Sequence, residues 1–231
     1  MTAADRYCEA IYELAEDDID VLQVRIAERL GVSRPAVSEM TSRLVAEGLL
    51  ASADGRLSLT DLGLRTAESA VRRHRLAERF LVDVLHLGWA EAHELAGSWQ
   101  RVIDERTEPA LVELLGDPAT CPHGNPIPAR DGLHGPIDSI GLAGGLVTLA
   151  SCGVGDVGQV SRVTERLENE PGMLVALEHA GLVPGTRVEV LSVAVDGAMA
   201  VRAARGVIAL AASSAASILV RPGDLELASH S

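Results

Sequence analysis

The stretch that decides the fold of the N-terminal region is LQVRIAERLGVSRPAVSEMTSRLVAEGLL, residues 22–50. Apolar residues recur at three- and four-residue steps over residues 24–30, and a second helical period runs over residues 34–47. Gly31 interrupts the two periods, and Ser33 is suited to cap the second helix. The stretch therefore predicts two short helices joined by a tight turn.

The flanking sequence extends this motif on both sides. RYCEAIYELAED, residues 6–17, has a helical period. LLASADGRLSLTDLG, residues 49–63, alternates around an Asp54-Gly55 turn, which is typical of a short hairpin. A helix, a helix-turn-helix and a hairpin together predict a winged helix-turn-helix.

The rest of the chain changes character twice. Helical periods continue over residues 61–84 and then to about Leu115, a stretch dense in Gly and Pro follows, and short alternating runs begin at Leu146. The predicted fold class is mainly α with a small β domain. The predicted parts are a winged helix-turn-helix (1–65), a helical domain (66–127), a linker (128–145) and a small barrel-like domain (146–231).

The chain is acidic overall but contains one basic segment. The chain has a net charge of −13, and all 20 basic residues are arginine. Residues 21–79 hold ten arginines against seven acids, a local balance of +3 that leaves −16 elsewhere. A polyanion should therefore meet this segment. Without a signal peptide, a membrane-spanning run or a CxxC pair, we expect an intracellular protein with no membrane partner.

The second helix of the motif is predicted to enter the major groove of double-stranded DNA. The side chains expected to reach base edges are Ser33, Arg34, Pro35, Ala36, Ser38 and Glu39. The arginines expected to neutralise phosphates are Arg25, Arg43 and Arg56. An alternative is a winged helix that only contacts proteins and whose arginines are merely solvated.

Other residues give weaker signals when taken by spacing alone. His74 and Glu78 share a helical face and His93 lies one helix later, yet ordinary surface or core histidines are the favoured interpretation. His123, beside Cys121, is expected to be a loop residue rather than a ligand. Because no Ser or Cys has a base at suitable spacing, we do not expect an enzyme.

Three motifs in order resemble the diphtheria toxin repressor family of iron- and manganese-dependent regulators. They are RIAERLGVSRPAVSEMTSRL (25–44), RRHRLAERFL (72–81) and CPHGNPIP (121–128). The resemblance covers nearly the whole chain and implies that residues 146–231 form an SH3-like (FeoA-like) domain. It also implies a homodimer, formed through the helices after the wing, that binds palindromic operators when a divalent metal is present.

The resemblance carries over one metal site and part of an anion pocket. The family's ancillary metal ligands correspond to His74, Glu78, His93, Glu170 and Met173. The thioether of Met173 is less suited to iron or manganese than an oxygen donor, so this ligand is doubtful. One iron, manganese, cobalt, nickel or zinc ion is expected there. The adjoining anion pocket would keep Arg75 and Asn125, with Cys121 at its third position.

The family's primary, activating metal site is substituted. Its ligand positions correspond here to Arg6, Gly97, Gln100 and Arg101, two of which are permanent cations. Even at an effective dielectric of about 20, a dication ~4 Å from one guanidinium would be repelled by roughly 8 kcal/mol. No metal is therefore expected at this site, and the guanidinium groups are expected to fill its cavity.

Three consequences of that substitution remain open. The arginines could bridge the same helices through acids such as Glu9, Glu94 or Glu105, so that DNA binding is metal-independent or depends on the ancillary site alone. They could instead bind a small anion, or the site could have decayed. At the level of the whole protein, the alternatives are a conventional metal-activated repressor and a metal-binding or adaptor protein without operator binding.

Overall fold

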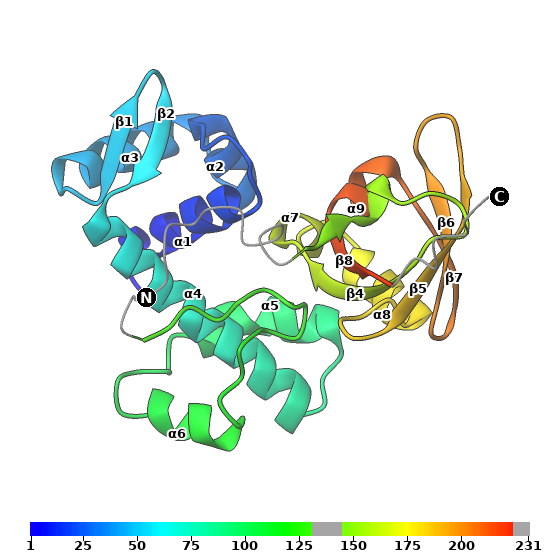
Figure 1. Cartoon of the computed structure of the whole chain (residues 1–231). Helices are drawn as coiled ribbons and strands as arrows, with labels where there is room; N and C mark the ends of the chain where they lie inside the picture. Colours follow the sequence, from blue (N-terminus) through cyan, green and yellow to red (C-terminus); the bar gives the residue numbers. More distant parts are fainter. Residues whose placement is uncertain (131–144, 224–231) are drawn as a thin grey trace. The chain divides into compact units, whose positions relative to one another are not determined.

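The computed structural model describes residues 1–130 and 145–223, which form two compact units (Figure 1). The first unit holds residues 1–80, 95–119 and 126–130, and the second holds residues 81–94, 120–125 and 145–223. Most of the predicted linker, residues 128–145, lies outside the described residues. Within the described ranges, no helix has both the length and the apolar character that crossing a bilayer requires.

The first unit is a winged helix-turn-helix followed by further helices, as the sequence predicts. Its helices and strands are α1 (Ala3–Glu16), α2 (Gln23–Leu30), α3 (Arg34–Ala46), β1 (Leu50–Ala53), β2 (Arg56–Leu59), α4 (Asp61–Arg79) and α6 (Glu108–Leu114). Helix α5 (Trp89–Trp99) begins in the second unit and ends in the first. Strands β1 and β2 pair as an antiparallel hairpin beside α3 (Figure 1).

Local sequence signals set the turns of this motif. Gly31 ends α2 in the left-handed conformation (φ 64°), which glycine adopts without a steric cost. The Ser33 hydroxyl accepts a hydrogen bond from the Ala36 backbone N–H (3.4 Å) and so caps α3. Asp54 (φ 50°) and Gly55 (φ 78°) form the hairpin turn, in which both central residues need positive φ.

Apolar side chains from α1, α2, α3 and the hairpin make one core, which fixes the position of α3. Ile11, Ile26, Val37 and Leu44 are each at most 1% exposed there. Burying one such side chain contributes about 1.5–3 kcal/mol. A second cluster packs α1 against α4, which runs unbroken from Asp61 to Arg79. The predicted boundary at residues 65 and 66 therefore falls inside a continuous helix.

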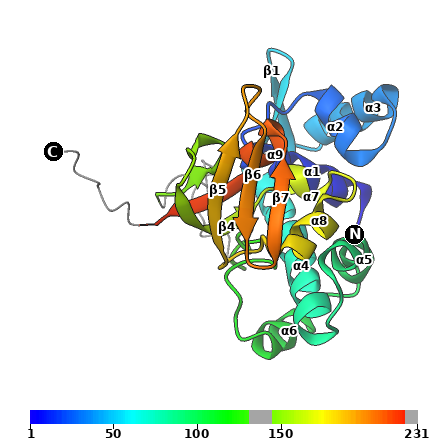
Figure 2. The same ribbon diagram turned by 90° about the vertical axis from the view of Figure 1, so that its right-hand side faces the viewer.

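The second unit is built on a six-stranded antiparallel sheet with the order β3-β8-β4-β5-β6-β7. Its strands are β3 (Val147–Thr148), β4 (Val157–Val163), β5 (Arg187–Val193), β6 (Met199–Ala203), β7 (Gly206–Leu210) and β8 (Ile218–Pro222). Its other helices are η2 (Leu149–Ser151), α7 (Glu165–Glu168), α8 (Met173–Ala180) and α9 (Ala212–Ala216). Figure 2 shows β5, β6 and β7 side by side with α8 near β7.

A segment before the predicted barrel also belongs to this unit. After α4 the chain forms a π-helical turn, η1 (Phe80–Val84), where the sequence predicts continued α-helix. Trp89 is 6% exposed within the core formed by the sheet, and its backbone N–H donates to Glu178 Oε2 (3.1 Å). Residues 81–94 and 120–125 therefore pack with the barrel, whereas the sequence pattern predicts that they belong to the helical domain.

Candidate nucleic-acid interface and metal centre

Helix α3 presents a polar face to solvent and an apolar face to the core. Val37, Thr41 and Leu44 are buried, at the spacing of one helical face. The residues predicted to contact bases are all exposed: Ser33, Arg34, Pro35, Ala36, Ser38 and Glu39. The N-terminal end of α3 is therefore accessible, as insertion into a major groove requires.

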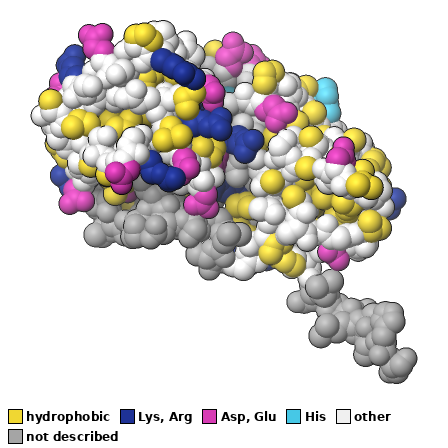
Figure 3. Space-filling model, turned by 90° about the horizontal axis from the view of Figure 1, so that it is seen from above, with side chains coloured by type: hydrophobic (Ala, Val, Ile, Leu, Met, Phe, Trp, Pro, Cys, Tyr) yellow, Lys and Arg dark blue, Asp and Glu magenta, His cyan; other side chains and the backbone are white. Residues whose placement is uncertain are grey.

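The arginines predicted to contact phosphate are exposed, and each already pairs with a carboxylate. The pairs are Arg25 with Glu28 (3.0 Å), Arg43 with Glu47 (2.7 Å) and Arg56 with Asp20. Exposed pairs of this kind contribute only about 0–1 kcal/mol, so a DNA phosphate could replace the carboxylate at small cost. On the face shown in Figure 3, arginine and acidic side chains are likewise interspersed.

The structure contradicts the prediction that guanidinium groups fill the substituted metal site. Arg6 is exposed and donates to the Leu30 backbone carbonyl (3.1 Å), at the end of α2, rather than to an acid. Arg101 is exposed as well. A Cβ built on Gly97 meets no atom within 4 Å. The long arginine side chains extend to solvent, where their charges remain hydrated, so they do not bridge the helices. Binding of a small anion by these arginines stays a prediction.

The buried member of the substituted site is Gln100, which is 4% exposed in the turn after α5. The orientation of the Gln100 amide is assigned from its surroundings, since two acceptors face it and only a nitrogen can donate to them. In this orientation Gln100 donates to Glu9 Oε1 on α1 and to the Ala70 backbone oxygen on α4, both at 3.2 Å. Glu9 is itself 7% exposed. A neutral amide thus joins α1, α4 and the end of α5. Gly97 offers no side-chain ligand, and among the described residues no group of three His, Cys, Asp or Glu ligand atoms lies around Gln100.

His74 lies between the carboxylates of Glu9 and Glu78, and Glu9 is also a partner of the Gln100 amide. His74 Nδ1 is 3.7 Å from Glu9 Oε1, and His74 Nε2 is 3.4 Å from Glu78 Oε1. Burial lowers the pKa of His74, but the hydrogen bond and charge of Glu78 and the charges of Glu9 and Glu13 outweigh it and raise the pKa to about 9. The imidazole is therefore protonated at neutral pH and holds α1 and α4 together through opposite charges.

The residues carried over for the anion pocket have other partners in the structure. The guanidinium of Arg75 is fully buried and makes a two-pronged ion pair with Glu16 (3.1 and 2.5 Å), and it also donates to the Pro126 carbonyl. Asn125 donates its amide to Glu168 and to the Val163 carbonyl. An anion at Arg75 would have to displace a buried carboxylate, so the anion pocket remains only a prediction.

A cluster of donor side chains lies inside the second unit. His93 on α5, His123 in the loop 120–125 and Glu168 on α7 offer ligand atoms that lie within 4.8 Å of one another. Glu168 Oε2 is 3.3 Å from His93 Nδ1 and 3.0 Å from His123 Nδ1. His123 and Glu168 are fully buried, and the His93 side chain is 18% exposed. Two imidazoles and a carboxylate suit a divalent transition-metal ion.

This cluster corrects the carry-over of Glu170 and Met173. Glu170 is exposed and accepts from the Ser214 hydroxyl at 3.5 Å, while Met173 packs against the apolar core of the barrel. The carboxylate next to His93 is that of Glu168 and not that of Glu170. The segment TERLENE, residues 164–170, holds three glutamates. The short helix α7 buries Glu165 and Glu168 on one side. The sequence alone does not show which of the three glutamates faces His93.

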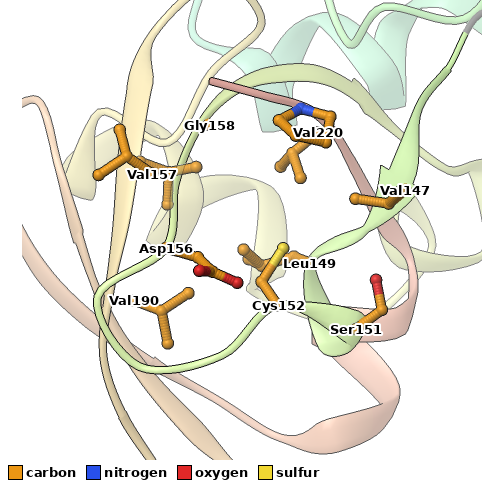
Figure 4. A pocket seen from close by; sticks show the side chains of 11 residues that line it. Val147, Leu149, Ser151, Cys152, Asp156, Val157, Gly158, Val190 and Val220 are labelled. Carbon is orange, nitrogen blue, oxygen red and sulfur yellow. The ribbon is translucent and has the colours of Figure 1, made fainter. Parts of the chain in front are cut away.

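An apolar pocket of about 150 Å³ opens elsewhere on the second unit (Figure 4). Valines such as Val157, Val190 and Val220 line it together with Cys152 and Asp156. Burial, together with the charge of Asp156, raises the pKa of the Cys152 thiol, which keeps the thiol protonated. The pocket contains no pair of groups suited to catalysis.

The chain is similar in sequence to known repressors over most of its length. The chain is 39% identical over 189 residues to the iron-dependent repressor IdeR of Mycobacterium leprae, covering 80% of this chain and 82% of that protein. It is 34% identical over 188 residues to the diphtheria toxin repressor of Corynebacterium diphtheriae, covering 81% and 83%. The chain belongs to the diphtheria toxin repressor family. Because this is a family of transcriptional repressors, the prediction that the chain is not an enzyme is confirmed.

Domain matches and solved structures agree with this membership. Residues 1–56 match the iron dependent repressor N-terminal DNA binding domain, and residues 60–129 match the iron dependent repressor metal binding and dimerisation domain. Residues 147–222 match the FeoA domain. A manganese-dependent transcriptional repressor in complex with manganese superposes with a TM-score of 0.81 at 32% identity, covering 96% of this chain and all of the other. The predicted fold class is thereby confirmed.

Proposed function

We propose that this member of the diphtheria toxin repressor family is a homodimeric repressor that binds palindromic double-stranded DNA operators. Its DNA-competent form would be held by the Gln100 amide rather than by an ion at the substituted primary site. A single divalent ion, of iron, manganese, cobalt, nickel or zinc, would bind at the ancillary site. The observation that carries the proposal is that Gln100, oriented to donate, joins α1 to α4 at the substituted site.

Operator binding is supported by the accessible end of α3 and by the wing. Six exposed side chains at the start of α3 include donors and acceptors suited to base edges. Arg25, Arg43 and Arg56 flank them and would give affinity that weakens with salt. The adaptor alternative assigns no role to this arrangement of exposed polar side chains around a helix N-terminus.

A homodimer is supported by exposed apolar side chains at the end of α5, in the turn after it and on α6. The exposed fractions are 36% for Leu95, 37% for Trp99, 68% for Val102 and 62% for Leu114. The Phe80 and Trp99 rings lie 5.3 Å apart in the same unit. Large apolar side chains left exposed on a monomer are candidates for an interaction surface. A second copy of the chain is the partner that a palindromic operator requires, because operator symmetry mirrors the symmetry of the protein.

DNA binding without a metal ion is supported by the contacts that Gln100 makes at the substituted site. An ion that joined α1 to the later helices would fix the position of α3, since α1 and α3 share one core. The Gln100 amide makes the same kind of connection through Glu9 and Ala70 without an ion. The ancillary ligands in this proposal are His93 and Glu168, to which the family resemblance adds Glu78 and His74; His74 would have to lose its proton to bind the ion.

Binding of the purified full-length protein to duplexes selected from a random pool tests the proposal. We expect a palindromic consensus and an affinity that falls steeply with salt, by roughly 0.9 logarithmic units per phosphate contact for each tenfold rise in salt. Arg34→Ala should weaken binding, whereas Arg187→Ala, at an exposed arginine of the barrel, should not. An adaptor would give no consensus, and that result would reject the proposed function.

A further inference from the structure

Three arginines lie on the exposed face of the six-stranded sheet in the second unit. Arg187 on β5 and Arg221 on β8 are both register partners of Gln159 on β4, so these side chains form one row across three adjacent strands. Arg202 on β6 is the register partner of Glu189, two residues along β5 from Arg187. Residues directly opposite each other point to the same face of a sheet, and all three arginines are exposed.

This face is basic, although the protein as a whole is acidic. The chain has a net charge of −13, yet the six strands contain a single acidic residue, Glu189. Glu189 pairs with Arg202 at 3.4 Å, and both side chains of that pair are partly exposed. Arg187 and Arg221 make no side-chain ion pair or hydrogen bond with the rest of the described chain. The face therefore offers two guanidinium groups that no carboxylate of the described chain neutralises.

The surface is hollowed on both sides of Arg187. One hollow, of about 440 Å³, extends from Arg187 to Gln159 and Arg221. The other, of about 330 Å³, extends from Arg187 to Glu189 and Arg202. Both hollows are open to solvent, and together they cross β8, β4, β5 and β6. This shape suits a chain lying across the sheet better than a small molecule enclosed by it.

The spacing of the arginines suits the carboxylates of an extended peptide. Neighbouring strands lie about 4.8 Å apart, so the Cα atoms of Arg187 and Arg221, two strands apart, are roughly 10 Å from each other. Arg187 and Arg202 are diagonal neighbours, about 7–8 Å apart. An extended peptide rises about 3.3 Å per residue, which places side chains two or three residues apart at roughly 7 or 10 Å. Each guanidinium can hold a carboxylate through two parallel hydrogen bonds.

We propose that Arg187, Arg202 and Arg221 bind an acidic peptide segment of a partner protein, with aspartate or glutamate at every second or third position. A single nucleic-acid strand fits less well, because such strands bind through aromatic side chains on which the bases stack, and residues 145–223 contain no aromatic residue. A peptide carboxylate would replace Glu189 at Arg202 at small cost, since that pair is exposed. The surface belongs to the second unit alone and does not depend on operator binding.

Binding of a labelled peptide to the full-length protein without DNA tests the assignment. The probe is a decapeptide of alternating glutamate and glycine, followed by fluorescence anisotropy at low salt, and the same peptide with glutamine in place of glutamate should not bind. Exposed ion pairs are worth up to ~1 kcal/mol, so we expect up to about fivefold weaker binding in Arg187→Gln and roughly tenfold or more in Arg187→Gln with Arg221→Gln. The matched control Arg166→Gln, at an exposed arginine of α7, removes the same charge outside the sheet and should bind as the unchanged protein does.

The variants should keep the melting temperature of the unchanged protein, because Arg187 and Arg221 are exposed. A single-stranded oligonucleotide with the same number of charges is the second probe and should bind more weakly than the glutamate peptide. The assignment is overturned if the double variant binds the glutamate peptide as Arg166→Gln does, or if the glutamine peptide binds equally well. It is also overturned if the oligonucleotide binds more tightly and loses that binding in the double variant. Since no operator is present, failure here is distinct from failure of the proposed operator binding.

Discussion

Replacing Gln100 by glutamate should convert a metal-independent link into one that needs an ion. The Gln100 amide nitrogen lies 3.2 Å from Glu9 Oε1, and both side chains are buried. In Gln100→Glu, two carboxylates would face each other across that distance. Two like charges ~4 Å apart repel by about 4 kcal/mol at an effective dielectric of 20, and a hydrogen bond to a charged acceptor, about 1.5–3 kcal/mol, is lost as well.

The expected result is a large loss of stability in the presence of a chelator. At about 2–4 °C per kcal/mol for a chain of this size, the repulsion of about 4 kcal/mol alone lowers the melting temperature by roughly 10 °C, and the lost hydrogen bond lowers it further. A divalent ion between the two carboxylates would remove the repulsion. Manganese should therefore raise the melting temperature of Gln100→Glu by more than it raises that of the unchanged protein.

Gln100→Met is the matched control, because it removes the same hydrogen bonds without adding charge. It should lose about 1.5–3 kcal/mol of stability and gain no extra stabilisation from manganese. Both variants are measured by thermal unfolding, followed by circular dichroism, with chelator and with manganese. A melting temperature for Gln100→Glu equal to that of the unchanged protein in chelator would refute the reasoning.

Four further substitutions test other features of the structure. Glu47→Gln frees Arg43 from its 2.7 Å ion pair and should tighten DNA binding about two- to fivefold in fluorescence anisotropy, because an exposed pair is worth up to ~1 kcal/mol; weaker binding would count against a phosphate contact. Val102→Glu puts a charge on a side chain that is 68% exposed in the proposed dimer surface, and sedimentation should show monomers; an unchanged dimer would exclude Val102 from the interface. Gly97→Ala should add about 0.5–1 kcal/mol to the free energy of unfolding, since its Cβ meets no atom within 4 Å. Gly63→Ala should cost about 1–3 kcal/mol, since its Cβ would lie 2.0 Å from a backbone oxygen; equal effects of the two alanines in chemical denaturation would contradict this.

The fold of the N-terminal region could be predicted from sequence because its signals are local. The cap at Ser33, the break at Gly31 and the turn at Asp54-Gly55 act within a few residues, and the structure has each of them. The division into units could not be predicted in this way. Trp89 belongs to the barrel because its ring is buried in that core and its backbone bonds to Glu178, and helical periodicity does not report such long-range contacts.

The candidate sites show the same difference between local signals and long-range contacts. The exposed face of α3 follows from helical spacing, whereas the destination of a long side chain does not. Arg6 and Gln100 are both polar positions in the sequence, yet Arg6 extends to solvent and Gln100 is buried against Glu9. The sequence predicts that His123 is a loop residue rather than a ligand, and His123 does lie in a loop. Its proximity to Glu168 depends on packing between segments 45 residues apart.

The measurement that tests the central claim most directly is the affinity of the full-length protein for its selected operator, with chelator and with manganese. Allosteric ligands typically change an affinity by about 5–150-fold. Because Gln100 already joins α1 to α4, the protein stripped of metal should bind the operator with an affinity within about threefold of the manganese-loaded protein. Stripped protein that binds the operator only after manganese is added would contradict the account.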